Sequence, residues 1–221
     1  CPETQPRIKF IPEPQEIAEI ALFHMDRVKD TVVSFGQGCD GEPLIVGDIL
    51  VEAVKLIRAK RSDNMINVNT NGSRPDIVSR LFDAGLDSIR VSMNSARIEY
   101  YARYYKPIGY AFHDVLASIK IAKKKGGFVS LNYLTMPGFT DTKPELAAVS
   151  KLIEKYHIDM IQWRNLNYDP MEYFREIGIS VRRSDILGVR SIMQSLEKRF
   201  PKLIFGYFNP SRGKIKAAKA H

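Results

Sequence analysis

The order of strand-like and helix-like segments is the feature that most constrains the fold of this 221-residue chain. Short runs rich in β-branched and aromatic residues alternate with longer segments whose apolar residues recur at helical spacing. Consecutive β-α-β units of this kind form a parallel sheet with right-handed crossovers and with helices outside the sheet. The pattern therefore predicts an α/β protein, either a flat doubly wound sheet or a closed or partial barrel.

The predicted segments follow one another without a break in composition. Strand-like runs cover residues 31–35, 64–71, 87–94, 128–136 and 159–167, and a last one covers 203–208. Helical segments cover residues 16–28, 47–60, 74–84, 96–125, 143–156 and 184–200, and the long one is interrupted near Lys106-Pro107 and Gly109. The pattern loosens after residue 168. We therefore predict a core over residues 1–168 and a C-terminal α/β extension over residues 169–221, which begins by covering the open side of the barrel and ends in a basic tail.

The charge of the chain leaves several kinds of partner open. A formal net charge of +8 and a pI near 9.4 are compatible with an anionic partner, such as nucleic acid or a phosphorylated substrate. The basic residues nevertheless occur in short groups, which favours a solvated surface and a loose tail: Lys123-Lys124-Lys125, Arg182-Arg183, and Lys214, Lys216 and Lys219. We find no signal peptide and no apolar run long enough to span a membrane. The two cysteines, Cys1 and Cys39, fit a reducing compartment and predict a cytoplasmic protein.

A turn rich in glycine follows the first predicted strand, in the sequence TVVSFGQGCDGEPL. Gly36, Gly38 and Gly41 allow the backbone to take a positive φ or to lie close to a ligand. Pro43 directs Glu42 towards an extended conformation. The turn would hold one carboxylate and bare backbone carbonyls at the carboxyl end of a parallel strand, where α/β sheets and barrels bind ligands. An ordinary strand-to-helix loop is the alternative.

Polar side chains recur near the carboxyl ends of four predicted strands. A buried parallel strand is usually a continuous apolar run, so this repetition indicates a cavity for a polar small molecule with ribose, amino and carboxylate groups. We find no Ser-His-Asp set, no phosphate-loop pattern and no metal-ligand spacing among the histidines. The polar residues are Asn67, Asn69, Thr70 and Asn71, then Ser92, Asn94 and Ser95, then Ser130 and Asn132, and finally Gln162, Arg164, Asn165 and Asn167.

Several of these stretches together resemble the radical S-adenosylmethionine (radical SAM) superfamily, over about residues 1–168 and without a subfamily assignment. Gly41-Glu42-Pro43 is similar to its Gly-Gly-Glu-Pro motif, with Cys39-Asp40 where a Gly pair or Gly-x is common. Asn69-Thr70-Asn71-Gly72 is similar to the Thr-Asn-Gly ending of the next strand. Residues 90–94 are similar to the strand that follows in the family, whose serine contacts the ribose or the carboxylate of the cofactor. Ser92 would be that serine. Cys1-Pro2-Glu3 resembles the last cysteine of the CxxxCxxC loop.

The resemblance implies a partial (β/α)6 TIM-like barrel that binds a [4Fe-4S] cluster and S-adenosylmethionine. In this family three cysteines bind three irons, and the methionyl amino and carboxylate groups chelate the fourth. An electron then cleaves the sulfonium to give a 5′-deoxyadenosyl radical, which abstracts hydrogen from a substrate. The resemblance further implies an oxidoreductase or transferase with an electron donor such as flavodoxin or ferredoxin. Cys1 would be a cluster ligand, and the cofactor-binding residues would be Gly41, Glu42, Pro43, Asn69, Asn71, Ser92, Asn94, Asn132, Gln162 and Arg164.

Some roles remain open within this interpretation. Gln162, Arg164 and Asn165 would touch the adenine, the carboxylate of the cofactor or the substrate, and the alternative for Arg164 is a structural ion pair. Cys39 is too far along the chain to complete the cluster loop with Cys1. Because the chain opens at Cys1 and not at Met, we expect the two other cluster cysteines before it. The alternative is that this piece does not hold a cluster.

Two other functions compete with the radical enzyme. An RNA- or nucleotide-binding α/β module would use the basic charge and exposed aromatic residues, although tyrosines at such spacing more often pack a helix face: Tyr100, Tyr101, Tyr104 and Tyr105. An RNA-modifying radical enzyme would combine both signals. A conventional acid–base enzyme would use Glu42 and Asp40, but the sequence offers no evident partner base or metal site.

Overall fold

Six parallel strands form one sheet whose spatial order is the order of the chain. The structure is a computed structural model and describes residues 10–36, 41–165, 168–179, 181–206 and 208–219. A doubly wound sheet reverses its strand order at a switch point, whereas this sheet runs from β1 to β6 without a reversal. The sheet therefore curves into a partial (β/α)6 barrel, and no ladder joins the β1 and β6 edges within the described strands. The strands are β1 (Val32–Phe35), β2 (Met65–Thr70), β3 (Ser88–Met93), β4 (Phe128–Thr135), β5 (Met160–Asn165) and β6 (Ile204–Phe205).

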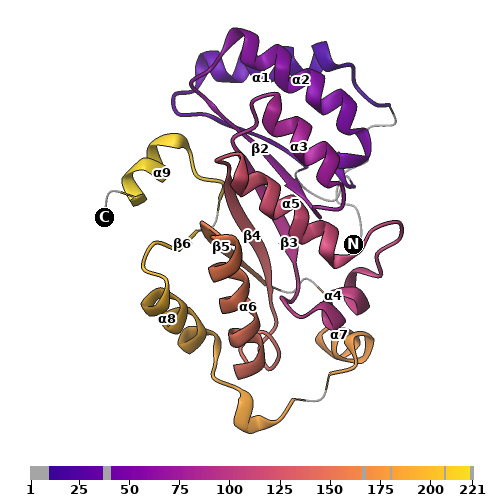
Figure 1. The fold of residues 1–221 in the computed structure, drawn as a ribbon, viewed down its shortest axis with the longest axis vertical. Helices are drawn as coiled ribbons and strands as arrows, with labels where there is room; N and C mark the ends of the chain where they lie inside the picture. The colour runs from indigo at the N-terminus through magenta and orange to yellow at the C-terminus, as the bar shows by residue number, and fades with distance from the viewer. Residues whose placement is uncertain (1–9, 37–40, 166–167, 180, 207, 220–221) are drawn as a thin grey trace.

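Helices cover one face of the sheet, as Figure 1 shows. Short helices α4 (Ile98–Tyr105) and α7 (Pro170–Ile177) pack against each other beyond the carboxyl end of β3. Two 3-10 turns are η1 (Pro43–Val46) and η2 (Arg183–Asp185). The helices on the covered face are α1 (Pro14–Arg27), α2 (Gly47–Lys60), α3 (Pro75–Asp83), α5 (Phe112–Lys124), α6 (Lys143–Tyr156) and α8 (Val189–Arg199).

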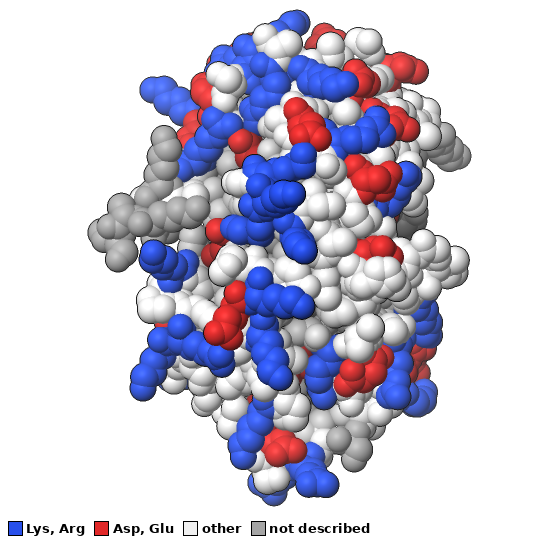
Figure 2. Space-filling view, viewed as in Figure 1, with Lys and Arg blue, Asp and Glu red and all other residues white. Residues whose placement is uncertain are grey.

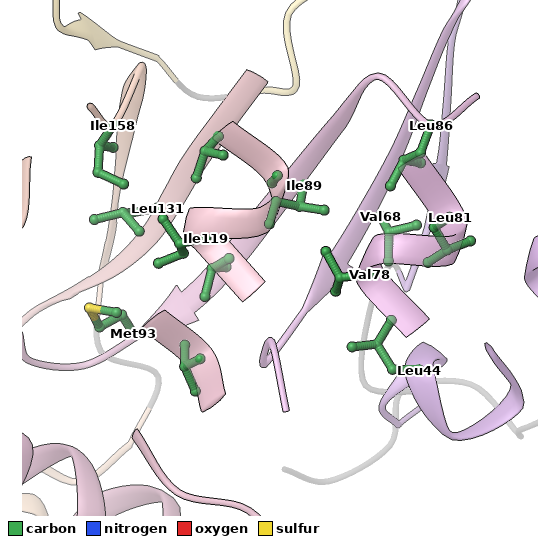
Figure 3. Packing of buried hydrophobic residues seen from close by; sticks show 14 of the residues in the cluster. Leu44, Val68, Val78, Leu81, Leu86, Ile89, Met93, Ile119, Leu131 and Ile158 are labelled. Atoms are coloured by element: carbon green, nitrogen blue, oxygen red, sulfur yellow. The ribbon is translucent and has the colours of Figure 1, made fainter. Parts of the chain in front are cut away.

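The main core lies between the sheet and these helices. Alternate residues of each strand point to opposite faces, so one set of strand side chains faces the helices. In Figure 3, Val68 and Ile89 of the sheet lie near Val78 of α3, and Leu131 and Met93 lie near Ile119 of α5. All of these side chains are buried. Because complete burial of one aliphatic side chain contributes about 1.5–3 kcal/mol, this face holds the barrel together.

Most sequence predictions for individual elements are confirmed, and one needs correction. The long predicted helix is two helices, α4 and α5, separated where Lys106 and Gly109 take positive φ angles of 45° and 76°. The predicted helix over residues 184–200 is wrong at its start, because α8 begins only at Val189. Gly188, the residue before α8, has a φ of 85°, which redirects the chain between η2 and the helix.

The prediction of a loose C-terminal tail is also wrong. Helix α9 (Arg212–Lys219) follows β6 and its first residues pack beneath the amino-terminal end of the sheet. Arg212 donates to Asp87 at 2.5 Å and to the Ser62 carbonyl at 2.6 Å, and the Ser211 hydroxyl donates to Asp30. Ile215 packs against a small cluster of residues that begin three strands, namely Met65, Phe128 and Met160. The segment therefore covers the bottom of the barrel, while the division at residue 168 stays a prediction.

None of the helices in the described ranges combines the length and apolar character that crossing a membrane requires. Figure 2 shows that Lys and Arg are spread over the helix-covered face, with Asp and Glu between them.

Candidate functional site

The sheet face opposite the helices is polar. Residues paired in register on neighbouring strands share a face of the sheet, so the register groups the polar side chains into layers. Ser34, Asn67 and Ser88 form the layer nearest the amino-terminal ends of the strands. The next layers are Asn69, Arg90 and Ser130, and then Ser92, Asn132 and Gln162. The interpretation of the polar strand ends as one lined surface is therefore supported by the register.

The deepest layer is hydrogen-bonded within the chain. Asn67 donates to Ser34 at 2.8 Å and accepts from Ser88 at 2.7 Å. Asn69 donates to the Gly36 carbonyl at 3.3 Å and to Ser34 at 3.4 Å. Asn209, which follows β6, donates to Ser34 at 2.8 Å. Asn69 therefore joins β1 to β2, and its predicted contact with a cofactor stays a prediction.

The glycine-containing turn brings Glu42 back over the end of β2. Gly36 has a φ of 72°, and a Cβ there would clash with the backbone carbonyl of Asn69. Gly41 has a φ of 102°, and Glu42 is extended at φ −92° and ψ 115°, as the sequence predicts. One carboxylate oxygen of Glu42 accepts from the Thr70 hydroxyl at 2.5 Å and from the Leu44 N–H at 3.1 Å. The other accepts from the Asn71 N–H at 2.7 Å. Glu42 thus fixes the turn to the end of β2.

The Glu42 carboxylate has no cation beside it within the described residues. Burial raises the pKa of Glu42 above its usual value, and the hydrogen bonds from Thr70, Asn71 and Leu44 offset part of that effect. A half-buried carboxylate without a counter-charge favours a ligand that brings a positive group. The turn can therefore hold an ammonium group at the carboxyl end of the sheet.

Two buried polar atoms on the polar face have no partner among the described residues. The Asn132 amide donates weakly to Ser92 at 3.5 Å, and its Oδ1 atom accepts nothing. Arg90 donates through Nη1 to Gln162 at 2.8 Å, and its Nε atom is buried without a hydrogen-bond partner. Buried polar groups are nearly always hydrogen-bonded, so an unpaired acceptor and an unpaired donor on one surface fit a face that binds polar ligands.

The remaining predicted residues have different surroundings. Asn94 is fully buried and donates to the Tyr100 carbonyl at 3.1 Å and to the Tyr173 hydroxyl at 3.3 Å, so it joins β3 to α4 and α7. The Asn71 side chain accepts from the Ser73 N–H at 2.8 Å. Arg164 is exposed near the end of β5, and Pro43 begins η1. The roles of these four residues towards a cofactor stay predictions.

The predicted metal ligand Cys1 lies outside the described residues, as do Cys39, Asp40 and Asn167. Within the described ranges, no group of three His, Cys, Asp or Glu side chains is placed to hold a metal ion. The cluster is therefore a proposal that rests on Cys1 and on family membership.

A second buried carboxylate fixes the loop after β3. Glu145 of α6 is fully buried and accepts from Ser95 at 2.9 Å, from the Ala96 N–H at 2.9 Å and from Arg97 at 2.8 Å, and also from the Tyr133 hydroxyl. Arg97 makes this an ion pair within the chain. Glu145 thus positions the loop after β3, and the donors around it already use both of its carboxylate oxygens.

Sequence reasoning did not single out Arg90 or Asn209. A charged residue within a buried parallel strand is itself unusual, and that signal was available for Arg90. Asn209 reaches the site from the C-terminal tail, and nothing local in the sequence indicates this contact.

The family model described as the radical SAM superfamily matches residues 1–148 of this chain. The chain therefore belongs to the radical SAM superfamily. Its subfamily is not assigned by this match.

Two curated relatives are similar over part of their length. A probable GTP 3′,8-cyclase of Thermococcus kodakarensis is 38% identical over 102 residues, which cover 46% of this chain and 32% of the relative. An uncharacterized protein of Methanocaldococcus jannaschii is 28% identical over 167 residues, which cover 74% of this chain and 56% of the relative. The match thus spans about a third to a half of the relatives' length.

Solved structures show the same fold at low sequence identity. Methylornithine synthase has a TM-score of 0.60 at 18% identity, covering 86% of this chain and 54% of that chain. Streptococcus suis SuiB bound to S-adenosylmethionine has a TM-score of 0.58 at 14% identity, covering 90% and 42%. A domain of a pyruvate-formate lyase-activating enzyme from Bacteroides vulgatus has a TM-score of 0.55 at 13% identity, covering 79% and 98%.

Proposed function

We propose that this chain is the cofactor-binding barrel of a radical SAM enzyme that abstracts hydrogen from a substrate. The observation that supports this most directly is the polar sheet face, which carries the Glu42 turn together with the unpaired buried Oδ1 atom of Asn132. S-adenosylmethionine offers an ammonium group, a carboxylate and ribose hydroxyls, and these groups match the acceptors and donors of that face. When bound together, a [4Fe-4S] cluster and S-adenosylmethionine supply a 5′-deoxyadenosyl radical.

The chain's own residues bind and orient the cofactor in this proposal. The Glu42 carboxylate and the backbone carbonyls of its turn accept hydrogen bonds from the amino group. Ser92 and Asn132 hydrogen-bond the ribose or the carboxylate, because they are paired in register on the polar face close to the carboxyl end of β3. Gln162 and Arg164 contact the adenine, the carboxylate or the substrate. Cys1 is a cluster ligand through its thiolate.

The substrate and the electron donor belong to the proposal only in outline. The probable GTP 3′,8-cyclase is matched over 32% of its length, which is too little to transfer GTP as a substrate. The cluster requires a low-potential electron, so a donor such as flavodoxin or ferredoxin and a reducing cytoplasmic location are consistent with the chemistry. Whether the reaction is an oxidoreduction or a group transfer depends on the substrate.

Anaerobic reconstitution of the full-length protein with iron and sulfide tests the proposal. We expect the electron paramagnetic resonance signal of a reduced [4Fe-4S] cluster, and 5′-deoxyadenosine after addition of S-adenosylmethionine and a reductant. Cys1→Ala should abolish both signals, whereas the matched variant Cys39→Ala should retain them. A protein that yields neither a cluster nor 5′-deoxyadenosine would contradict the proposal, as would loss of the cluster in Cys39→Ala alone.

The alternative of an RNA-binding module rests on the basic charge and on exposed aromatic residues, and the structure does not support the second of these. The tyrosines expected to be exposed pack among themselves: Tyr101 is fully buried and stacks on Tyr105, and Tyr104 contacts Tyr173 edge to face. The basic residues on the face seen in Figure 2 are interspersed with acidic ones and form no continuous stripe. RNA binding with a steep salt dependence would be the result that favours this alternative.

A further inference from the structure

Arg90 differs from every other Lys or Arg that is not exposed within the described residues. Each of the others forms an ion pair with a carboxylate, whereas Arg90 donates one hydrogen bond to the neutral Gln162. The paired cations are Arg58 with Asp87, Arg61 with Asp26 and Asp63, Arg97 with Glu145, Lys123 with Asp159, and Arg212 with Asp87.

Arg90 lies on a central strand of the polar face. Its register partners are Asn69 on β2 and Ser130 on β4. Its own strand, β3, is the third of the six strands, so β2 lies between it and the edge strand β1. The side chain reaches towards the carboxyl end, because its Nη1 atom donates to Gln162 one layer above. The Nε atom is buried and has no hydrogen-bond partner in the part of the chain that the structure describes.

The electrostatic surroundings favour a negative group beside Arg90. Burial lowers the pKa of Arg90, and the positive charge of Arg164 lowers it further. A guanidinium nevertheless stays protonated in proteins, so the charge persists, and no carboxylate of the described residues forms an ion pair with it. A half-buried charge without a partner is costly, and a ligand anion would relieve that cost.

We propose that Arg90, with Gln162 and Arg164 beside it, forms a subsite that binds a carboxylate or phosphate group of the substrate. The planar guanidinium presents Nε and an Nη atom in the fork geometry that such oxyanions accept. This inference rests on the proposed function, since it places the substrate against the same polar face as the cofactor.

The Cα atom of Arg90 lies deeper in the barrel than Glu42, Ser92 and Asn132, the residues proposed to bind the cofactor. Arg90 lies two residues before Ser92 on the same strand, which places its Cα about 7 Å further from the carboxyl end. Glu42 and the layer of Ser92 and Asn132 lie at that end. The subsite is therefore placed beside the cofactor, with Arg90 entering from the deeper layer and Gln162 in the layer of Ser92 and Asn132.

Calorimetric titration of the reconstituted protein at constant ionic strength tests the subsite. Inorganic phosphate and succinate serve as separate probes for the two kinds of oxyanion, and S-adenosylmethionine is titrated in a parallel experiment. Arg90→Gln removes the charge, Arg90→Lys retains the charge without the fork, and Arg190→Gln is a matched control. Arg190 is exposed on α8, so this control changes the net charge by the same amount at a distant surface.

We expect one of the two anions to bind the wild-type protein and Arg90→Gln to weaken it by about tenfold or more, since a hydrogen bond to a charged group is lost. Arg190→Gln should change it by less than about twofold, and Arg90→Lys should fall between the two. Arg90→Gln should leave the affinity for S-adenosylmethionine within about twofold. Circular dichroism verifies the fold, and Arg90→Lys serves as the decisive variant if Arg90→Gln does not fold.

Three results would overturn the subsite. The first is that neither anion binds the wild-type protein at millimolar concentration. The second is an equal loss in Arg90→Gln and Arg190→Gln, which would indicate general attraction to a basic surface. The third is a parallel loss of S-adenosylmethionine binding in Arg90→Gln, which would assign Arg90 to the cofactor. Failure of the proposed function is distinct from all three, because it appears as absent S-adenosylmethionine binding in the wild-type protein.

Discussion

Glu145 and Glu42 are both carboxylates that hold a loop at the carboxyl end of the sheet, but only Glu145 meets a cation. Arg97, two hydroxyls and a backbone N–H surround Glu145, so its charge is compensated within the chain. Glu42 receives a hydroxyl and two backbone N–H groups and no cation of the described residues. The charge of Glu145 is therefore paired without a ligand, whereas the negative charge of Glu42 can be paired by a positively charged group of a ligand.

The same contrast separates Arg58 and Arg212 from Arg90. At the amino-terminal end of the sheet, Arg58 and Arg212 share Asp87, which also accepts from the Ile66 N–H at 2.7 Å. Among the described residues, Arg90 on the polar face has only the neutral Gln162 as a partner. Charges that are paired within the chain thus stabilise the fold at the amino-terminal end of the sheet and at the loop after β3. Glu42 and Arg90 each lack an oppositely charged partner among the described residues, and both lie on the surface where we propose that ligands bind.

Removing the compensated carboxylate should produce the largest loss of stability. Glu145→Ala leaves Arg97 without its partner and several buried donors unsatisfied, so we expect a loss of about 3–5 kcal/mol in the free energy of unfolding. Glu154→Ala on the same helix is the control, because the exposed pair of Glu154 with Arg199 should contribute less than about 1 kcal/mol. Urea denaturation measures both, and equal losses would contradict the contrast.

Releasing the C-terminal segment should have a smaller effect. Arg212→Ala removes one ion pair with Asp87 and one hydrogen bond to Ser62, but Asp87 keeps Arg58 and the Ile66 N–H. We expect about 1–2 kcal/mol of destabilisation. Lys214→Ala, at an exposed position of the same helix, should change stability by less than about 0.5 kcal/mol. An Arg212→Ala variant as stable as Lys214→Ala would mean that α9 does not hold the base of the barrel.

Neutralising Glu42 should affect cofactor binding more than folding. Glu42→Gln removes the charge that we propose attracts the ammonium group, so the affinity for S-adenosylmethionine should fall about tenfold. Calorimetric titration measures this fall, with Glu197→Gln on the surface of α8 as the control. Unchanged affinity with a large loss of turnover would instead indicate an acid–base role for Glu42.

The stability of the Glu42→Gln variant should also depend on pH in a defined direction. The pKa of Glu42 is raised in the folded state, so its ionised form is disfavoured relative to the unfolded chain. The usual pKa of a glutamate is 4.5. As the pH rises from 4.5 through the raised pKa of Glu42, the wild-type protein should therefore lose stability relative to Glu42→Gln. At still higher pH the difference in stability should stay constant. Paired unfolding curves at several pH values measure it, and a difference that grows in favour of the wild-type protein would contradict the assignment.

The smallest effect on stability should come from Asn132. Because its Oδ1 atom is buried without a partner, Asn132→Leu should change the free energy of unfolding by less than about 1 kcal/mol or increase it. The affinity for S-adenosylmethionine should nevertheless fall severalfold. Thr135→Val is the control on the same strand, since its hydroxyl is also buried and unpaired but points to the helix-covered side. Equal cofactor affinity in both variants would remove Asn132 from the site.

Local patterns in the sequence predicted the architecture well. Alternating strand and helix periodicity gave the strands β1 to β6 to within a few residues, because burial of a strand or helix face imposes that spacing. The extended conformation of Glu42 and the positive φ angles of Gly36 and Gly41 followed from residue type. Helix α7 and the ordered start of α9 were not predicted. The sequence carries a helix signal for α7, because Asp169 caps it, Pro170 begins it and Gly178 follows its end. The start of α9 is fixed by tertiary contacts such as that of Arg212 with Asp87.

The sequence by itself indicated a parallel α/β fold and the polar edge with Glu42 at its turn, and its resemblance to the radical SAM superfamily implied the partial barrel. Only the tertiary structure decided which charges are compensated. Arg58 meets Asp87 and Arg97 meets Glu145 across 29 and 48 positions of the chain, whereas Arg90 meets Gln162 across 72. A residue's type fixes that it is charged, but the identity of its neighbour follows from strand register and packing. The difference between a charge that holds the fold and a charge available to a ligand therefore exists only in the folded molecule.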